Sequence, residues 1–472
     1  MVKARKFFYI ILFSLVFSFG GIYSQAVFAQ AGTPIANAIY PYLQDVTKNS
    51  IEIAWYSSAS SSGADVSYGL TSSYGSSAKE TIEPIAVVSN TSFVHKVLLE
   101  GLSTNTAYHF QIRDGSSTSD DSTFITAPEA GAPFDFLVYG DIANNNDNPR
   151  TAFYTIAWNE AEAMLAHNPQ TIALMLGDHQ TGGTDAEWQP QFFLPDRDVL
   201  KNTVIYNVFG NHEVRVAQTY DKYFDPPTTG GSDSELYYSF NYGNVHFVVL
   251  DGNQSRAVGS LQYKWLLKDL SSTSAQNADF RILATHQPGL AYGGGHAETN
   301  DNGFTDAIES LYSVSAIKKN VDLILMGHNH VYERDYKPEG TKSGITWVTV
   351  GTVGGNPGIP PTQGEYLKYA GPRGYGYIVL STTKENISGT YYYTDGFGNA
   401  GVTPVVKDTF EIPVQKSAVK KEVKKTEVAT TTKKVEVPVV QKVVATTTPV
   451  VNTVAVEKLG WWGRFWRWVL GR

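Results

Sequence analysis

Short segments of alternating apolar and polar residues dominate the first third of the chain. Four of them are separated by Gly, Ser and Asn, and they cover residues 50–56, 64–68, 93–99 and 107–113. Alternation with a period of two is typical of strands that bury one face. The pattern predicts an antiparallel β-sandwich over residues 34–128, with Trp55 pointing inward. We find no cluster of titratable residues in this region, which favours a structural or docking role for it.

From residue 134 onward, apolar strand-like runs alternate with helical patterns. Strands are predicted at residues 134–140, 171–177, 203–209, 245–250, 281–285, 322–326 and 346–350, and helices at 151–167, 261–270 and 305–318. This alternation is the signature of an α/β domain. We place that domain at residues 133–412.

The amino-terminal residues 1–29 have a pattern of their own. A basic start precedes an apolar run at residues 7–22, and a small-x-small triplet follows at residues 29–31. This pattern predicts a secretory signal peptide and therefore an exported protein, extracellular or associated with the cell envelope. An uncleaved membrane anchor is the alternative, because the run is close to the roughly 17 residues that a spanning helix needs.

The carboxy-terminal segment divides into two parts. Residues 414–456 are rich in Lys, Thr, Val, Glu and Pro, which predicts an extended low-complexity linker. Residues 457–472 are rich in Trp and Arg and too short to span a bilayer. We interpret them as an amphipathic segment that contacts a membrane or envelope surface. A docking peptide and a helix packed on the body are the alternatives.

Composition narrows the possible chemistry. The chain has 472 residues and no cysteine, which excludes disulfides, thiolate metal sites and a thiol nucleophile. Its net charge is −8, although residues 414–472 hold twelve Lys or Arg against four Glu. The remaining body is therefore strongly acidic, and it is not expected to hold a nucleic acid.

A short polar cluster follows each of five predicted strands. The clusters are Gly140-Asp141-Ile142-Ala143, Gly177-Asp178-His179-Gln180, Gly210-Asn211-His212-Glu213, Thr285-His286-Gln287-Pro288 and Gly327-His328-Asn329-His330. Because the carboxyl ends of strands meet at one edge of an α/β sheet, the clusters are expected to converge. A preceding glycine would let the backbone turn sharply there.

Carboxylate, amide and imidazole groups suit Fe, Zn or Mn better than a soft metal. The set contains more ligands than one tetrahedral ion needs, so we expect two ions that share one carboxylate. Two ions roughly 3.5–4 Å apart clamp a phosphoryl group and generate hydroxide near neutral pH. The sequence therefore predicts a dinuclear metal site.

These residues resemble the metallophosphoesterases of the calcineurin-like superfamily, and more specifically the purple acid phosphatases. The resemblance rests on Gly327-His328-Asn329-His330-Val331-Tyr332-Glu333-Arg334, on Gly210-Asn211-His212-Glu213, and on a preceding sandwich similar to a fibronectin type III domain. It covers about residues 35–412. It implies a fibronectin III-like all-β sandwich followed by an α/β metallophosphoesterase domain of two packed mixed sheets flanked by helices.

The resemblance also implies roles for individual residues. The first metal would be held by Asp141, Asp178 and His330, and the second by Asp178, Asn211, His286 and His328. Asp178 would bridge the two ions. His212 would contact the phosphate and act as an acid toward the leaving group, and His296 would approach the substrate from a glycine-rich loop.

Two positions depart from the family pattern. The purple enzymes have a tyrosine three residues after the bridging aspartate, whose phenolate binds ferric iron and gives the colour, but Thr181 stands there. Ala143 occupies a place where other metallophosphoesterases carry a histidine. His179 or Asn144 could replace the missing ligand.

The sequence therefore predicts an exported dinuclear-metal phosphoesterase, similar to acid phosphatases, in which a metal-bound hydroxide attacks a phosphomonoester. A phosphodiesterase or nucleotidase of the same superfamily is one alternative. A catalytically retired adhesion or scaffold protein of the cell surface is the other.

Overall fold

A computed structural model describes the chain from residue 39 to residue 414, apart from residues 58–62, 81–83, 88–91, 143–171, 183–186, 194–195, 228–235, 295, 297–300, 314–320, 340–341, 356 and 395–403. The signal peptide expected at residues 1–29, the helix expected at 151–167 and the segment at 457–472 lie outside the described residues, as does the linker after residue 414. Within the described part, none of the helices is both long and apolar enough to cross a membrane.

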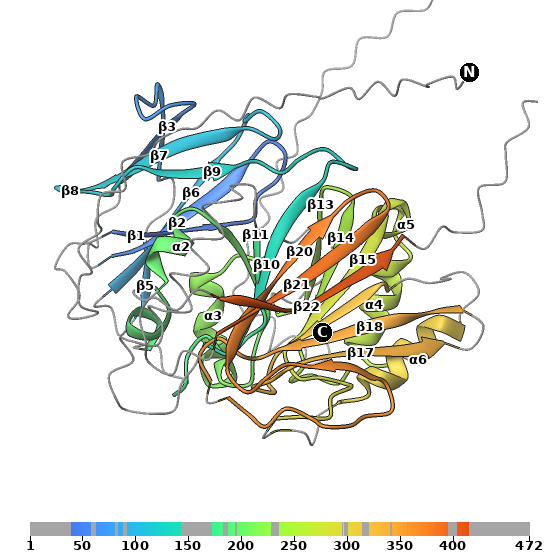
Figure 1. The fold of residues 1–472 in the computed structure, drawn as a ribbon. Coiled ribbons are helices and arrows are strands. Elements are labelled where there is room, and N and C mark those ends of the chain that lie inside the picture. Colours follow the sequence, from blue (N-terminus) through green and yellow to red (C-terminus); the bar gives the residue numbers. More distant parts are fainter. Residues whose placement is uncertain are drawn as a thin grey trace, which may run out of the picture. The chain divides into compact units, whose positions relative to one another are not determined.

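The amino-terminal region is a sandwich of two antiparallel layers, as the alternation predicted (Figure 1). One layer contains β1 (Tyr40–Gln44), β2 (Ile51–Ser57), β6 (Ser92–Leu99) and β5 (Ile85–Val87). The other contains β4 (Ser76–Lys79), β3 (Asp65–Gly69), β7 (Ala107–Asp114), β8 (Ser117–Thr118) and β9 (Ser122–Ile125). Trp55 is fully buried between the layers. The Tyr108 hydroxyl accepts a hydrogen bond from the Ser103 backbone N–H at 2.9 Å and closes a corner of the sandwich.

The expectation that the sandwich lacks a titratable cluster is wrong. His95 is buried with its Nδ1 3.1 Å from Glu80 Oε1 and its Nε2 3.5 Å from Asp114 Oδ2. Ser57 and Trp55 donate to the same Asp114 carboxylate at 3.0 and 3.3 Å. The cluster is not visible in the sequence because its members come from separate strands and a connecting segment. The two acids flank opposite edges of one ring, so the arrangement serves the sandwich core and does not form a metal cage.

The second region is an α/β domain with two mixed sheets, which confirms the predicted fold class. The first sheet continues from the sandwich layer and has the order β12 (Val204–Asn207), β11 (Ile172–Met175), β10 (Phe134–Tyr139), β20 (Tyr375–Thr382), β21 (Asn386–Thr394), β22 (Val405–Pro413). The second sheet has the order β13 (Tyr238–Tyr242), β14 (Val245–Leu250), β15 (Phe280–Thr285), β16 (Leu323–Met326), β18 (Lys342–Val350), β17 (Tyr332–Glu339), β19 (Leu367–Ala370). Strands β10, β11 and β12 are mutually parallel, and so are β14, β15, β16 and β18.

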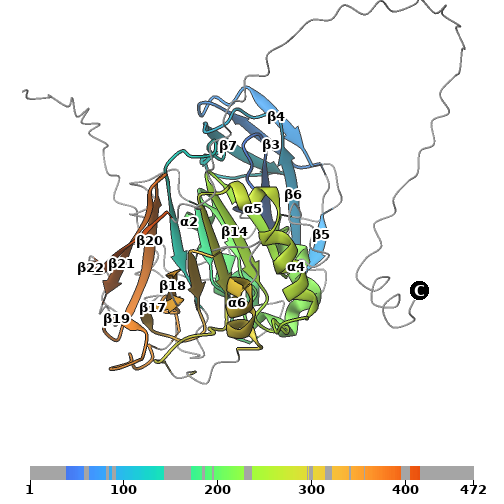
Figure 2. The ribbon, with the colours of Figure 1, turned by 90° about the vertical axis from the view of Figure 1, so that its right-hand side faces the viewer.

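Helices flank the second sheet on its outer side (Figure 2). They are α4 (Leu261–Leu270), α5 (Thr273–Asn277) and α6 (Phe304–Ser313). The bounds of α4 are those that the sequence predicts, and its first turn is capped by Ser260, whose side chain accepts from the Tyr263 N–H. Shorter helical segments are α2 (Arg197–Leu200), α3 (Ala217–Tyr223), a π-helical turn (Gln189–Phe193) and a 3₁₀ turn (Glu213–Val216).

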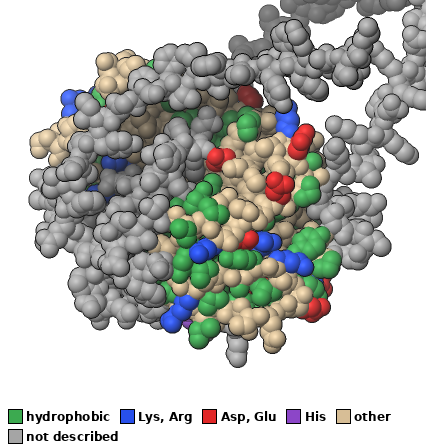
Figure 3. Space-filling model, viewed as in Figure 1, with side chains coloured by type: hydrophobic (Ala, Val, Ile, Leu, Met, Phe, Trp, Pro, Cys, Tyr) green, Lys and Arg blue, Asp and Glu red, His purple; other side chains and the backbone are tan. Residues whose placement is uncertain are grey.

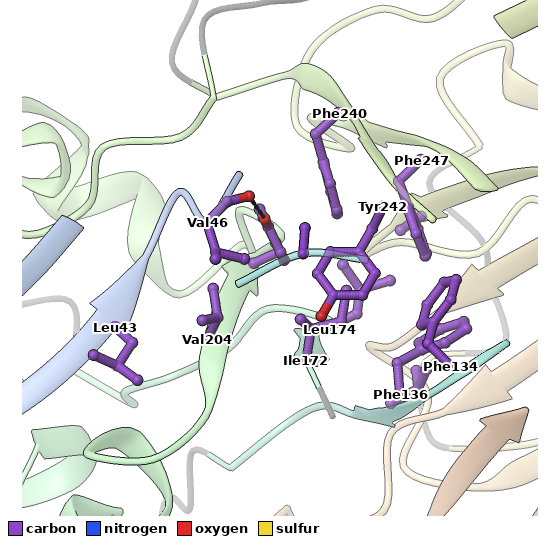
Figure 4. Packing of buried hydrophobic residues seen from close by; sticks show 14 of the residues in the cluster. Leu43, Val46, Phe134, Phe136, Ile172, Leu174, Val204, Phe240, Tyr242 and Phe247 are labelled. Atoms are coloured by element: carbon purple, nitrogen blue, oxygen red, sulfur yellow. Dashed lines mark hydrogen bonds between the residues drawn. The ribbon is translucent and has the colours of Figure 1, made fainter. Parts of the chain in front are cut away.

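The core lies between the two sheets. Phe134 and Phe136 of β10 meet Tyr242 of β13 and Phe247 of β14, with ring centroids 4.8 and 5.3 Å apart (Figure 4). Burial of such rings supplies the main drive for packing the sheets together. The packing of the two sheets of the α/β domain holds the strand ends, and the loops that follow them, in fixed places.

The sandwich domain and the α/β domain share one sheet, because β1 pairs with β12 in parallel. Lys96 of β6 donates to Asp225 at 2.7 Å, and the Tyr42 hydroxyl donates to the Tyr223 backbone carbonyl at 2.6 Å. On the described part of the face shown in Figure 3, basic, acidic and apolar side chains are interspersed, and no continuous basic patch is visible there.

Candidate metal centre

The five polar clusters lie where parallel strands end. Asp141 follows β10, Asp178 follows β11, and Asn211 and His212 come shortly after β12. His286 follows β15 directly, and His328 and His330 come shortly after β16. The first three strands belong to one sheet and the last two to the other, so the centre is assembled at adjoining edges of both sheets.

One group of side chains surrounds the Nε2 atom of His286. This atom lies 2.9 Å from Asn211 Oδ1 and 3.2 Å from Asp178 Oδ2. His328 Nδ1 lies 3.3 Å from the same atom. One potential ligand atom each from Asp178, His286 and His328 lie within 4.8 Å of one another, which is a spacing that a single ion can bridge.

A second group adjoins the first through the His328 backbone. Asp141 is fully buried, and its Oδ1 is 3.6 Å from His330 Nε2. Both carboxylate oxygens of Asp141 are 2.9 Å from the His328 backbone N–H, which fixes the orientation of the carboxylate. The structure therefore brings together Asp141, Asp178, Asn211, His286, His328 and His330, in two adjoining groups.

The donor set fits metal ions. His286 Nδ1 donates its hydrogen to the Leu176 backbone carbonyl at 2.7 Å, so the ring presents Nε2 to the centre. That nitrogen faces the oxygens of Asn211 and Asp178, and such lone pairs repel unless a proton or a cation lies between them. A carbonyl that fixes the ring in this way is the usual support of a metal-binding histidine.

Electrostatics favour a cation in the same place. Burial opposes a charge on His286, but the Asp178 and Asp141 carboxylates outweigh it and raise the pKa of His286 to about 10. Burial would also raise the pKa of Asp178, yet His286 and His212 together lower it below its usual range. Burial raises the pKa of Asp141 well above its usual range. A metal ion would replace the His286 proton as the balancing positive charge.

Burial, followed by the charge of His286, lowers the pKa of His328 to about 3. Its imidazole is therefore neutral over the ordinary pH range. A neutral ring is the form that binds a metal.

The backbone turns at the candidate ligands themselves. Asp141, Asp178 and His328 have φ values of 60°, 57° and 67°, in the left-handed region that non-glycine residues rarely adopt. Strain of this kind is concentrated at functional sites. Gly210 is needed because there is no room for a side chain: a Cβ there would lie 2.3 Å from Asp178 Oδ1. The role that the sequence assigns to the preceding glycines is thus partly wrong.

His212 and His296 both border the centre. His212 Nδ1 donates to the Thr181 backbone carbonyl at 2.6 Å, while its Nε2 lies 3.7 Å from Asp178 Oδ2. His296 is exposed, and its ring centroid is 4.8 Å from that of His328 and 5.6 Å from that of His330. Both imidazoles therefore lie beside candidate metal ligands.

The replacement for the missing tyrosine is not His179. The His179 ring lies among aromatic side chains, 5.0 Å from Phe192, and its Nε2 is 2.8 Å from Asn207 Oδ1. The Thr181 hydroxyl donates to Gln191 Oε1 at 3.1 Å. Asn144 and Ala143 lie outside the described residues.

Sequence reasoning missed Glu213, although it ends one of the quoted clusters. This carboxylate is fully buried and accepts backbone N–H bonds from Asp178 at 3.0 Å, His179 at 2.8 Å and Gly210 at 2.9 Å. It thereby links the turn after β11 to the loop after β12. An acidic residue directly after Asn-His was the available signal, but only the folded chain shows what it binds.

Glu333 was missed in the same way. Its carboxylate accepts the backbone N–H groups of Tyr292 and Gly293 at 2.7 and 2.9 Å. These two residues lie in the glycine-rich loop that leads to His296.

Two family models match the chain. The model described as purple acid phosphatase, N-terminal domain, matches residues 37–126, and the one described as calcineurin-like phosphoesterase matches residues 134–332. These matches correspond to the sandwich and to the larger part of the α/β domain.

Relatives and solved structures agree with these matches. The chain is 26% identical over 301 residues to purple acid phosphatase 15 of Arabidopsis thaliana, covering 56% of this chain and 54% of that protein. It is 23% identical over 340 residues to Fe(3+)-Zn(2+) purple acid phosphatase 12 of the same plant, covering 66% and 70%. Its fold is similar to a purple acid phosphatase from yellow lupin (Lupinus luteus) seeds, with a TM-score of 0.65, 18% identity, and coverage of 80% and 74%. The chain thus spans about half the length of the first relative.

Proposed function

We propose that this chain is a dinuclear-metal phosphoesterase acting on phosphomonoesters, because the models of the purple acid phosphatase N-terminal domain and of the calcineurin-like phosphoesterases match residues 37–126 and 134–332. One observation carries this proposal. Asp178 Oδ2 lies 3.2 Å from His286 Nε2, and Asp141, which interacts electrostatically with Asp178, has its Oδ1 3.6 Å from His330 Nε2. Two adjoining groups of ligand atoms of this kind support two ions that share the Asp178 carboxylate.

The proposed ligands are those that the sequence predicts. Asp141, Asp178 and His330 would hold one ion, and Asp178, Asn211, His286 and His328 the other. When bound, two ions of Fe, Zn or Mn neutralise phosphoryl charge and lower the pKa of water, so that water can attack phosphorus near neutral pH. The name of the relative Fe(3+)-Zn(2+) purple acid phosphatase 12 makes a mixed pair one option.

The histidines would complete the chemistry. Since His212 Nδ1 donates to the Thr181 carbonyl, a proton on Nε2 is the one that can pass to the leaving oxygen. His296 is exposed beside His328 and His330, so its side chain would bind the phosphoryl oxygens. His212 would thus donate a proton to the leaving group, and His296 would bind the negative charge of the phosphoryl group.

Export and contact with an envelope or membrane surface stay predictions from the sequence. They rest on residues 1–29 and 457–472, which the structure does not describe.

The decisive experiment measures metal content and hydrolysis on the same sample. We expect full-length protein loaded with Fe, Zn or Mn to bind two ions and to hydrolyse a chromogenic phosphomonoester. Asn211→Ala should lower the metal content toward one ion and reduce kcat/KM by about 100-fold, because a ligand of the second ion is lost. Two bound ions without hydrolysis of any monoester would overturn the proposal, and diester hydrolysis alone would favour the phosphodiesterase alternative.

The spectrum of the iron-loaded protein is a second readout. Thr181 replaces the tyrosine of the purple enzymes, and its hydroxyl is bound to Gln191. We therefore expect no purple absorption band, while Thr181→Ala should leave the spectrum unchanged.

A further inference from the structure

The glycine-rich segment of residues 289–294, here called the histidine loop, follows β15 and precedes the exposed His296 in the chain. Gly294 has a φ of 84°, and its N–H donates to the Ile359 carbonyl at 3.0 Å. Glycines give the backbone wide conformational freedom, so such a loop does not hold a fixed shape by itself. The position of the His296 ring over His328 and His330 therefore needs support from outside the loop.

Glu333 supplies that support from the neighbouring strand β17. Its two carboxylate oxygens each accept one backbone N–H, Oε1 from Tyr292 at 2.7 Å and Oε2 from Gly293 at 2.9 Å. Hydrogen bonds to a charged acceptor are stronger than those between neutral groups. The fit is close, because a Cβ at Gly293 would lie 3.2 Å from Glu333 Oε2 and 2.3 Å from Pro361 Cδ.

The strand that carries Glu333 is itself held in place. Tyr332 and Arg334, the residues on either side, both bind Asp408 of β22, at 2.8 and 2.7 Å. Alternation along a strand places Glu333 on the opposite face, toward the histidine loop. The same strand begins two residues after His330, so one rigid element fixes both a candidate metal ligand and the loop that precedes His296.

Stability does not account for this carboxylate. Glu333 is fully buried, and a buried carboxylate is costly unless its hydrogen bonds compensate. Its close neighbour on the same face is another buried acid, Asp335, and burial, followed by the charge of Glu333, raises the pKa of Asp335 to about 8, so that Asp335 is uncharged at neutral pH. A neutral or apolar side chain would serve a purely structural role at lower cost, whereas the paired bonds to the histidine loop need a carboxylate.

We propose that Glu333 is a positioning residue that holds the histidine loop so that His296 faces the substrate phosphoryl group. It would act through His296 and would not touch the substrate. The inference rests on the proposed phosphoesterase function for its kinetic consequence, but the anchoring of the loop is independent of any activity.

A double-mutant cycle with metal counting tests the kinetic part on the full-length, metal-loaded protein. Glu333→Gln keeps the shape of the side chain and replaces one acceptor oxygen by an amide NH₂. We expect it to lower kcat about 10- to 100-fold with two ions still bound, because small misplacements of a reacting group cost rates of that order. In the His296→Ala background, Glu333→Gln should lower kcat by less than about twofold, since the imidazole that Glu333 positions is already absent.

The matched control is Glu385→Gln, which makes the same change on an exposed glutamate, and it should leave kcat unaltered. An equal loss of kcat from Glu333→Gln with and without His296 would overturn the proposal. So would loss of a metal ion, which would show that Glu333 acts on the centre itself. Wild-type protein that binds two ions without hydrolysis would instead contradict the proposed function.

Amide hydrogen exchange tests the anchoring without any reaction. In Glu333→Gln, peptides covering residues 290–294 should exchange faster than in the wild type, while peptides covering β16 should be unchanged. Unchanged exchange in the histidine loop would overturn the anchoring, whatever the activity of the enzyme.

Discussion

The unusual residues of this protein are buried carboxylates whose main hydrogen-bond donors are backbone N–H groups. Glu213 and Glu333 each accept such bonds from loops that carry site residues, and both are fully buried. Asp335, also fully buried, lies on the same face of β17 as Glu333. A carboxylate in such a place is maintained by geometry that would be lost with a shorter or neutral side chain.

Asp335 provides a prediction of pH dependence. Burial, and then the charge of Glu333, raise its pKa to about 8, whereas aspartate in an unfolded chain has a pKa of about 3.9. Between these values the folded protein keeps a proton that the unfolded chain releases. The resulting stability is fully present below about pH 4 and is lost as the pH rises to about 8. Asp335→Asn removes this ionisation and should therefore reduce the loss of stability as the pH rises.

The measurement is urea unfolding of the full-length protein at pH 5 and pH 8. The free energy of unfolding of the wild type should fall between pH 5 and pH 8. We expect the fall in Asp335→Asn to be smaller than that in the wild type by at least ~1 kcal/mol. Asp306→Asn, an exposed residue of α6, is the control and should follow the wild type. Equal losses in Asp335→Asn and wild type would contradict the prediction.

At the scale of elements, the sequence predicted best the segments with a clear period. Helix α4 has the predicted bounds because its apolar face and its cap are local features. Strands β20, β21 and β22 were not predicted. Strands β20 and β21 are rich in Tyr, Thr and Gly, and β22 mixes apolar and charged residues. The three strands are held by pairing with each other and with β10, more than 200 positions earlier in the chain. Such long-range pairing leaves little trace in a local pattern.

Glu213 joins two elements, the turn after β11 and the loop after β12, and its role can be tested by metal affinity. Glu213→Gln removes the charge that accepts the N–H groups of Asp178 and Gly210. We expect Zn or Mn affinity, measured by competition with a chelator, to fall about 10-fold, as for other groups that support metal ligands. Glu100→Gln, on an exposed residue of the sandwich, is the control. Wild-type affinity in Glu213→Gln would show that the turn keeps its shape without the carboxylate.

At the scale of the whole described body, Asp408 connects the two sheets of the α/β domain. It belongs to β22 of one sheet and binds Tyr332 and Arg334 of β17 in the other. The Arg334 guanidinium makes two bonds to it, at 2.7 and 3.0 Å. Because β17 also carries Glu333, this contact fixes the centre and the histidine loop relative to the opposite sheet.

Removal of the Asp408 charge should therefore destabilise the fold. Asp408→Asn leaves the Arg334 guanidinium, whose side chain is only 18% exposed, without its anion. We expect the free energy of unfolding to fall by about 2 kcal/mol, less than for a fully buried pair because some water still reaches it. Glu411→Gln on the exposed face of β22 is the matched control. Equal urea midpoints for Asp408→Asn and wild type would refute the connection.

The sequence by itself determined the fold class and the candidate ligands, because both depend on local order along the chain. An apolar strand followed at once by Asp, Asn or His is visible without a structure, and the ends of parallel strands meet within one sheet. That the clusters of the two sheets adjoin was decided by how the sheets pack. Tertiary structure alone decided which supporting groups hold those residues. Glu213 and Glu333 reach loops 34 and 41 positions away, and His179 turns into an aromatic core although it stands beside Asp178. Contacts over such distances are set by how the sheets pack, which no short pattern records.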